Sequence, residues 1–267
     1  MRPRTQSSVA VTGDGRSFVL LNASPDLPQQ LRAAPDLWPR TGLRHSPIAA
    51  VVLTNGDVDH VAGLLSLRER QSFRLIALPP VLAALAENPI FAVLAEGVVE
   101  RVEAMPGVPL AAAGLEIELF PVPGKAPLYR EGSDPVIGAE TGETTGVMVR
   151  GGSGHGALAY VPGCADLTPA LLDRLVEADI LLFDGTLYTD DEMIAAGVGR
   201  KTGRRMGHVP ISGAGGSLDR LKALPARKKV YIHINNTNPI LVEGSAERAT
   251  VESAGFEVAF DGLEIPF

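Results

Sequence analysis

The sequence predicts an α/β protein in which two packed β-sheets carry helices on their outer faces. Short apolar runs, typical of strands buried on both faces, alternate with segments of helical periodicity, as in proteins whose helices cover a sheet. The expected strands also outnumber those that one doubly wound sheet would need, so a second sheet is required. The 267 residues fit one large domain.

Composition and charge exclude several classes of protein. The hydrophobic content of 45% and the charged content of 21% are ordinary for a globular chain. The net charge of −7 argues against a nucleic-acid partner, because nucleic-acid binders are usually basic. No apolar run reaches about 18 residues, so we expect no transmembrane segment, and the first residues lack the apolar stretch of a signal peptide. With one cysteine, Cys164, no internal disulfide is expected. We therefore expect a cytoplasmic protein.

The first half of the chain alternates strands and helices. Residues 7–22 predict a hairpin, because two apolar runs flank a Gly-Asp-Gly turn. Ser24 is the expected N-cap of a short helix. Residues 48–54, IAAVVLT, form a continuous apolar run expected of a strand buried on both faces. Three further elements follow: a helix from His60 to Arg70, a strand over 73–79 and a helix over 81–87.

The second half is richer in strands. The strands are expected at 115–122, 144–150, 157–162, 179–185 and along KKVYIHIN from Lys228. Helices are expected at 171–178 and 245–255, before a terminal hairpin, FEVAFDGLEIPF. Residues 123–143 are irregular and rich in Gly and Pro. A loop of that length is more often functional or mobile than a simple connection.

Polar side chains follow three of the expected buried strands, in LTNGDVDH, LLFDGT and IHINNTN. Because ligand sites in α/β sheets form beyond the carboxyl ends of strands, we expect these side chains to converge. Such a cluster either binds a metal or transfers protons. The candidate residues are Asp57, Asp59, His60, Asp184, His208, His233 and Asn235.

The residues alone leave structural alternatives open for single members of this set. Asp59 is also placed to cap the helix that follows it. His233 lies in an apolar strand, where a lone histidine is as often a hydrogen-bonded core residue. Asp184 precedes a glycine and suits a turn.

One motif resembles a known superfamily. TNGDVDHVAGLL is similar to the His-x-His-x-Asp-His motif of the metallo-β-lactamase superfamily, with Asn55 and Asp57 at the leading histidine positions and Asp59 and His60 kept. More narrowly, RTQSS, LLNASPD, KAPLY, DGTLYTDDEM, GRKTGRRMGH and HINNTNPIL resemble the family of pyrroloquinoline quinone (PQQ) biosynthesis B proteins. The resemblance runs from Arg4 to the C-terminus. It implies a four-layer αββα sandwich of two mixed sheets.

The resemblance also implies one metal ion rather than two. Asn55 and Asp57 replace two ligands of the superfamily's first metal, and no histidine lies where the later loop would supply a third. The second site would use Asp59, His60 and His233. Two histidines and a carboxylate with open positions form the facial triad of non-haem Fe(II) oxygenases. The same set suits zinc with a bound water. Fe(II) is therefore the favoured cofactor and Zn(II) the alternative.

The implied activity is hydroxylation of the tyrosine side chain in the Glu/Tyr-derived PQQ precursor. Asp57 would orient or deprotonate the phenol, and His208 would act as an acid or base just outside the metal ligands. Asp184 is a third expected catalytic residue. Two other functions stay open. The first is a non-catalytic carrier of PQQ or its precursor for transport to the periplasm, and the second is a zinc hydrolase.

A basic segment, GRKTGRRMGH, suits a substrate rich in carboxylates, which arginine binds in a bidentate manner. A solvated basic loop is the alternative. The expected substrate-binding residues are Lys201, Arg204, Arg205, Asn235, Lys125 and Tyr129. The expected partners are the precursor peptide or PQQ and other PQQ biosynthesis proteins, and a homodimer is compatible with the sequence.

The chain departs from the family at its start. Family members normally carry a strand, a Gly-rich loop and a cysteine trio that binds structural zinc upstream of RTQSS. We therefore expect residues 1–267 to form a single domain that lacks this strand and this zinc. Either the start is assigned too late and the native protein carries more structure, or the short form is genuine and exposes an edge of its first sheet.

Overall fold

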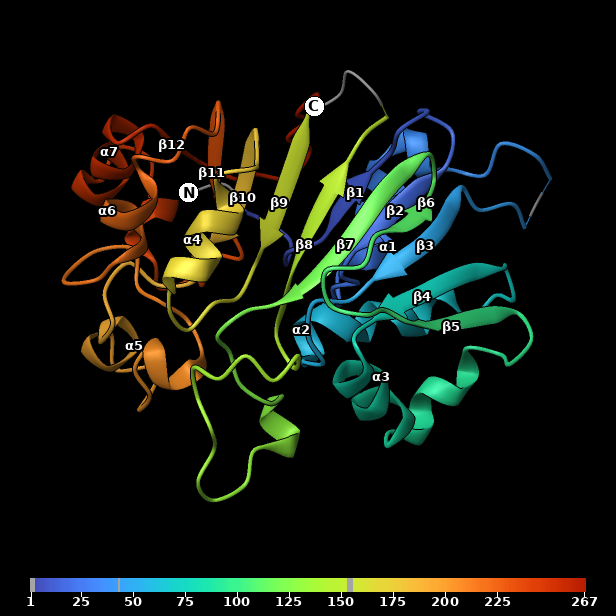
Figure 1. The fold of residues 1–267 in the computed structure, drawn as a ribbon, viewed down its shortest axis with the longest axis horizontal. Helices are drawn as coiled ribbons and strands as arrows, with labels where there is room; N and C mark the ends of the chain where they lie inside the picture. Colours follow the sequence, from blue (N-terminus) through green and yellow to red (C-terminus); the bar gives the residue numbers. More distant parts are fainter. Residues whose placement is uncertain (1–2, 43, 153–155) are drawn as a thin grey trace.

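Two β-sheets pack face to face, and helices cover their outer faces (Figure 1). This is the arrangement of the computed structural model, which describes residues 3–42, 44–152 and 156–267. The first sheet has the strand order β1-β2-β3-β4-β5 and the second the order β12-β11-β10-β9-β8-β7-β6. The predicted αββα sandwich of two mixed sheets is confirmed.

The first sheet contains one antiparallel pair and three parallel pairs. Its strands are β1 (Val9–Val11), β2 (Phe18–Leu21), β3 (Ile48–Val52), β4 (Phe73–Ala77) and β5 (Val99–Glu103). The hairpin β1–β2 and the strands β3 and β4 were predicted. Strand β5 was not, because its exposed charged residues interrupt any apolar run.

The second sheet joins an antiparallel half to a parallel half at β9. Its strands are β6 (Leu110–Ala112), β7 (Leu115–Pro121), β8 (Thr145–Arg150), β9 (Ala157–Val161), β10 (Ile180–Asp184), β11 (Lys228–Ile232) and β12 (Phe256–Val258). The predicted terminal hairpin is wrong, because β12 pairs in parallel with β11. Leu263, Ile265 and Phe267 pack against the core between the sheets instead, and Pro266 lacks the N–H that a ladder needs.

The helices are short and lie outside the sheets. They are α1 (Leu27–Ala33), α2 (Val58–Val61), α3 (Pro79–Ala86), α4 (Pro169–Leu175), α5 (Glu192–Ala195), α6 (Ser217–Leu221) and α7 (Ala246–Ser253). The 3₁₀ segments are η1 (Pro35–Leu37), η2 (Ala62–Leu67), η3 (Pro89–Val93), η4 (Leu128–Arg130), η5 (Arg204–Met206) and η6 (Pro239–Leu241). Within the described residues, every helix is too short or too polar to cross a membrane.

Two helix predictions need correction. Ser24 does not cap α1: the N-cap is Asp26, and the Ser24 hydroxyl donates to the side chain of Gln30 instead. The helix expected from His60 to Arg70 is the single turn α2 followed by the 3₁₀ segment η2. The close approach of Gly63 to the backbone of Ser24 fixes this path.

Strand β3 shows how the layers position the site. Ala50 and Val52 face the core between the two sheets, whereas Val51 and Leu53 face the core under the outer helices. The predicted burial of this strand on both faces is therefore confirmed. Because β3 has no polar face, the polar residues that follow it are gathered at the rim of the sandwich.

Candidate metal centre

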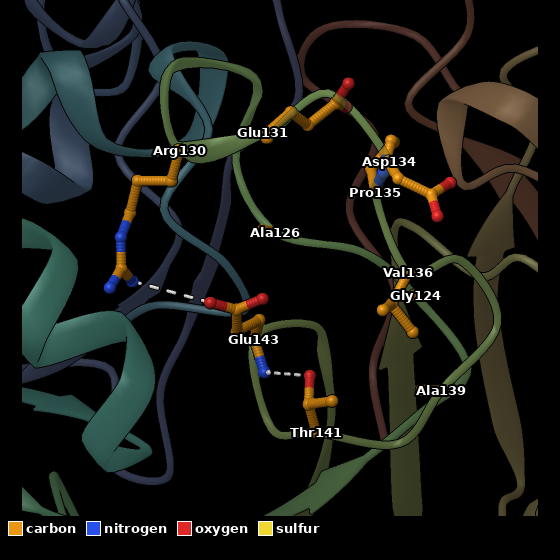
Figure 2. A pocket seen from close by; sticks show the side chains of 11 residues that line it. Gly124, Ala126, Arg130, Glu131, Asp134, Pro135, Val136, Ala139, Thr141 and Glu143 are labelled. Carbon is orange, nitrogen blue, oxygen red and sulfur yellow. Dashed lines mark hydrogen bonds and ion pairs between the residues drawn. The ribbon is translucent and has the colours of Figure 1, made fainter.

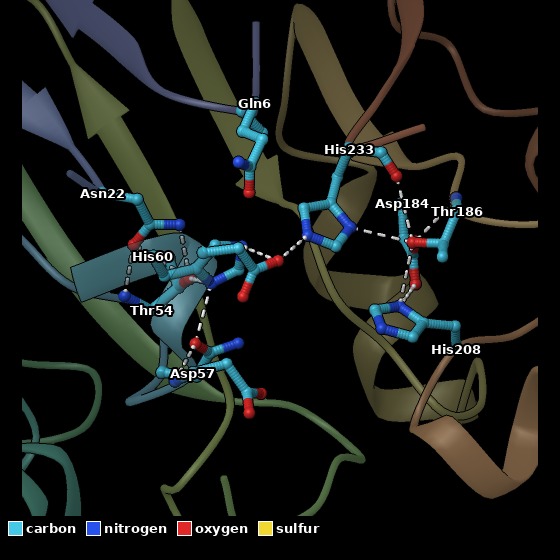
Figure 3. A network of polar contacts seen from close by, with 12 residues as sticks. Gln6, Asn22, Thr54, Asp57, His60, Asp184, Thr186, His208 and His233 are labelled. Carbon is cyan, nitrogen blue, oxygen red and sulfur yellow. Dashed lines mark hydrogen bonds and ion pairs between the residues drawn. The ribbon is translucent and has the colours of Figure 1, made fainter. Parts of the chain in front are cut away.

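The three polar strand ends meet at one rim of the sandwich (Figure 3). Asp59 and His60 lie on α2, just after β3, while Asp184 ends β10 and His233 follows β11. Ligand atoms of Asp59, His60 and His233 all lie within 4.8 Å of one another. Two separate sheets therefore supply one cluster of metal-ligand side chains.

His60 is oriented as a metal ligand requires. Its Nδ1 lies 2.7 Å from Asn55 Oδ1 and 3.4 Å from Thr54 Oγ1. Asn55 Oδ1 also accepts the backbone N–H of Asp57, so Nδ1 is the ring nitrogen that carries the proton. Burial lowers the pKa of His60 to about 3 and keeps the ring neutral. Its Nε2 is buried without a hydrogen-bond partner among the described residues, and such an orphaned lone pair suits a cation.

Asp59 supplies an ionised carboxylate. Its Oδ2 lies 2.9 Å from His233 Nε2 and 4.0 Å from His60 Nε2. Burial alone would raise the pKa of Asp59, but the hydrogen bond from His233 and the nearby imidazoles outweigh it and hold the pKa below its usual range. The N-cap position of α2 belongs to Asp57. Asp59 is thus not the cap that the residues alone allowed.

His233 does not lie within a strand, because β11 ends at Ile232 and His233 adopts the left-handed conformation with φ of 58°. This conformation is costly for a residue other than glycine and is concentrated at functional sites. Nδ1 lies 2.8 Å from Thr186 Oγ1, and the ring meets that of His60 edge-on at 4.9 Å. Burial favours the neutral ring, but the Asp59 carboxylate outweighs it and raises the pKa of His233.

A second group adjoins the first through His233. His208 Nδ1 donates to Asp184 Oδ2 over 2.8 Å, and the same oxygen accepts the backbone N–H of Cys164. Burial would raise the pKa of Asp184, but the His208 imidazole outweighs it and lowers the pKa. The Thr186 hydroxyl touches Asp184, His208 and His233. Thr186 was missed as a site residue, although it belongs to the quoted DGT.

The first group fits one transition-metal ion. Ligand atoms bonded to a metal at about 2.1 Å lie roughly 3.0 to 3.4 Å apart in octahedral or tetrahedral sites. The 2.9 and 4.0 Å separations around Asp59 Oδ2 bracket that range. The orphaned nitrogen of His60 supplies the third donor. Asn55, at a leading position of the motif, is engaged as the acceptor for His60.

The long irregular loop between β7 and β8 docks beside this centre. Asp57 Oδ1 accepts the backbone N–H of Leu128 over 3.0 Å, and Asp57 Oδ2 lies 3.9 Å from Lys125 Nζ. The Tyr129 hydroxyl donates to the carbonyl of Gly56. Burial raises the pKa of Asp57 despite the nearby ammonium of Lys125. Asp57, Lys125 and Tyr129, all expected at the site, are therefore brought together.

The basic residues separate into two locations. Lys201 and Arg205 join Lys125 around the carboxylate of Glu131, which was not singled out in the sequence because nothing there links it to cations about 70 residues away. A terminal nitrogen of Arg204 instead lies beside Gly215.

The Asn235 amide donates to Met193 Sδ and to the hydroxyl of Thr237. These contacts fix the loop that follows His233. Substrate contacts by Asn235 and by Arg204 stay predictions.

Comparison with known proteins identifies the family. The model of the family described as "Beta-lactamase superfamily domain" matches residues 18–234 of this chain. The coenzyme PQQ synthesis protein B of Methylobacterium radiotolerans is 54% identical over 273 residues, which cover 99% of this chain and 88% of that protein. The chain belongs to the coenzyme PQQ synthesis protein B family of the metallo-β-lactamase superfamily.

Two further proteins of the same family are similar to this chain over nearly its whole length. The coenzyme PQQ synthesis protein B of Methylobacterium nodulans is 55% identical over 264 residues, covering 98% of this chain and 88% of that protein. The crystal structure of Zn²⁺-bound PqqB from Methylobacterium extorquens superposes with a TM-score of 0.97 at 53% identity, over 100% of this chain and 89% of that one. The resemblance noted in the sequence motifs is therefore confirmed.

Proposed function

We propose that this PQQ biosynthesis protein is a single-metal oxygenase that hydroxylates the tyrosine-derived phenol of the Glu/Tyr precursor. The observation that carries the proposal is the ligand set itself: two histidines and one carboxylate, with Asn55 and Asp57 where a first metal would need histidines. Asp59, His60 and His233 would hold the ion. Iron(II) with such a triad supplies O₂ activation.

The remaining polar residues suit proton handling around the substrate. Burial beside the centre raises the pKa of Asp57, which makes its carboxylate a stronger base for a phenolic proton. The Asp184 carboxylate holds His208 through Nδ1, so the opposite nitrogen of this imidazole is oriented for proton exchange. The roles of Asp57 and His208 are those expected from the sequence, and Asp184 would serve by orienting His208.

The M. extorquens relative is Zn²⁺-bound, and two histidines with a carboxylate suit zinc, so Zn(II) is the alternative ion for this site. Zinc hydrolysis by two metals is disfavoured, because Asn55 and Asp57 replace ligands of the first site. A carrier of PQQ or its precursor is the second candidate function. The cations around Glu131 favour it, because they can bind carboxylates without a metal.

The test combines metal identity with turnover. The apo-protein is reconstituted anaerobically with Fe(II) or Zn(II), then exposed to air with ascorbate and a precursor peptide containing Glu and Tyr. Ascorbate supplies the two electrons that reduce the second oxygen atom of O₂ to water. We expect tyrosine to gain the mass of one oxygen atom with iron only, and His60→Ala to abolish the gain. His45→Ala, which removes a half-buried histidine outside the site, is the control. Tight binding of PQQ or precursor without any mass change would instead establish the carrier.

The proposal places the protein in the cytoplasm with other PQQ biosynthesis proteins as partners. It does not depend on a homodimer, since one chain supplies all three metal ligands. Location, partners and oligomeric state stay predictions.

A further inference from the structure

Glu131 carries a buried carboxylate among three cations. Its side chain is 6% exposed, and its Oε1 lies 3.0 Å from Lys125 Nζ. Its Oε2 lies 3.3 Å from Lys201 Nζ and 3.4 Å from Arg205 Nη1. Three positive charges therefore face one negative charge. Lys125 extends the group to the metal centre, because the same ammonium lies 3.9 Å from Asp57 Oδ2.

These contacts do not have the geometry of a fixed structural ion pair. Arg205 approaches through one nitrogen only, whereas strong arginine–carboxylate pairs are bidentate and shorter. Both hydrogen bonds to Oε2 are long. Burial would raise the pKa of Glu131, but the Lys125 ammonium beside Oε1 outweighs it and lowers the pKa, so Lys125 makes the firmest of the three contacts. Lys201 and Arg205 are held loosely, so another carboxylate can compete with Glu131 for them.

The cations are reachable and Glu131 has room to leave. The side chains of Lys201 and Arg205 are 39% and 37% exposed, so a ligand can approach them from solvent. Glu131 also lines a half-open pocket of about 290 Å³, whose lining residues all belong to its own loop (Figure 2). Gly132 follows it directly, with no described atom within 4 Å of the place of a Cβ. This part of the loop therefore faces open space, and glycine permits backbone conformations that other residues avoid.

We propose that Lys125, Lys201 and Arg205 form a carboxylate-binding site whose resident occupant is Glu131, and that a substrate carboxylate binds by displacing it. The inference rests on the proposed function for its ligand, a precursor derived from glutamate and rich in carboxylates. Glu131 then acts as an internal competitor. The loop between β7 and β8 releases the cations only to a ligand that presents carboxylates beside the metal.

The test is the affinity of full-length, Zn(II)-loaded protein for PQQ, which carries carboxylates and is not turned over with zinc. An internal competitor that fills a site about nine-tenths of the time weakens the apparent affinity about tenfold. We therefore expect Glu131→Gln to lower the Kd for PQQ about tenfold. Lys201→Met should raise the Kd at least threefold, because an exposed cation is lost.

Glu143→Gln is the matched control, since Glu143 lies in the same loop but pairs with Arg130. An unchanged or raised Kd in folded Glu131→Gln protein overturns the displacement, and an unchanged Kd in Lys201→Met overturns the site even if Glu131→Gln does not fold. The binding assay is independent of the hydroxylation assay. Failure of oxygen insertion with iron therefore rejects the oxygenase alone, whereas these Kd values decide the carboxylate site.

Discussion

At the scale of single residues, Asn55 stands where the superfamily motif has a histidine, and it orients a metal ligand instead of being one. Asn55 accepts the Nδ1 proton of His60 and thereby presents the opposite nitrogen to the metal centre. Partners of this kind fix the tautomer and the ring orientation of a ligand histidine. The departure from the superfamily motif therefore removes one metal site while supporting the other.

Removing this acceptor should weaken metal binding. We expect Asn55→Leu to reduce Zn(II) affinity roughly 10- to 100-fold, the usual cost of losing such a partner, as measured by chelator competition. Asn55→Asp retains an acceptor and should lose much less. Asn88→Ala, which alters a side chain bonded to the end of α3, serves as the control. Equal affinity in Asn55→Leu would contradict the orienting role.

Replacing His233 with alanine should destabilise the fold more than replacing it with glycine. With φ of 58°, alanine keeps the left-handed penalty that glycine avoids. We expect metal-free His233→Gly to be more stable than His233→Ala by about 1 kcal/mol in urea unfolding. The usual order, with alanine the more stable, would show that the backbone relaxes once the imidazole is gone.

Metal uptake should also release a proton from His233. The Thr186 hydroxyl donates to Asp184 and accepts from Nδ1, so Nε2 needs its own proton to face the Asp59 carboxylate. The raised pKa of His233 agrees with this charged form. An ion must displace that proton, so Zn(II) affinity should rise with pH until His233 is neutral without metal. Calorimetry in buffers of different ionisation enthalpy measures the release, which should be larger at pH 6 than at pH 9.

At the scale of elements, α2 and η2 are held against the segment that follows β2. Ala23 N–H donates to the carbonyl of His60, and Gly63 N–H donates to the carbonyl of Ala23. A Cβ at Gly63 would lie 2.2 Å from the backbone oxygen of Ser24. Backbone contact therefore sets the position of His60 together with the packing of Val61 and Leu64.

Gly63→Ala should damage both stability and the site. Overpacking typically costs about 1–3 kcal/mol, and we expect a loss at the upper end because backbone atoms must move. Thermal unfolding and Zn(II) affinity measure the two effects. Gly152→Ala has no described atom within 4 Å of the added methyl group and should be neutral. Wild-type metal affinity in Gly63→Ala would show that α2 is positioned by other contacts.

At the scale of the whole molecule, a buried polar chain joins the two sheets. Tyr160 on β9 reaches Asn22, which follows β2, over 3.2 Å, and Asn22 Oδ1 accepts the backbone N–H of Thr54 over 2.8 Å. Burial raises the pKa of Tyr160 above its usual value, so its hydroxyl stays protonated. Thr54 in turn lies beside His60. The contact between the sheets and the metal centre are therefore connected.

Tyr160→Phe should lower the stability of the protein, but the two sheets should still unfold together. Loss of the hydroxyl should lower the free energy of unfolding by about 1 kcal/mol, as urea titration measures. Unfolding should remain a single transition, as expected of one domain. Two resolved transitions would mean that the sheets behave as separate units.

The sequence predicted the features that depend on local pattern. Apolar runs located β3, β10 and β11, and the polar residues after them indicated a shared rim. Features set by contacts between distant residues could not be read in this way. The left-handed backbone of His233 and the meeting of Glu131 with Lys201, 70 residues away, depend on how the loops pack. The 3₁₀ path of η2 likewise follows from the contact of Gly63 with another segment.

Because the metal ligands lie far apart in the sequence, the metal site is completed late in the synthesis of the chain. Asp59 and His60 follow β3 of the first sheet, whereas His233 lies 174 residues after Asp59 and follows β11 of the second. A growing chain therefore carries an incomplete set until its C-terminal third has docked. The ion would enter a nearly finished protein, and its binding free energy would oppose separation of the sheets. Which ion is installed would then depend on the metals available to the folded protein in its compartment.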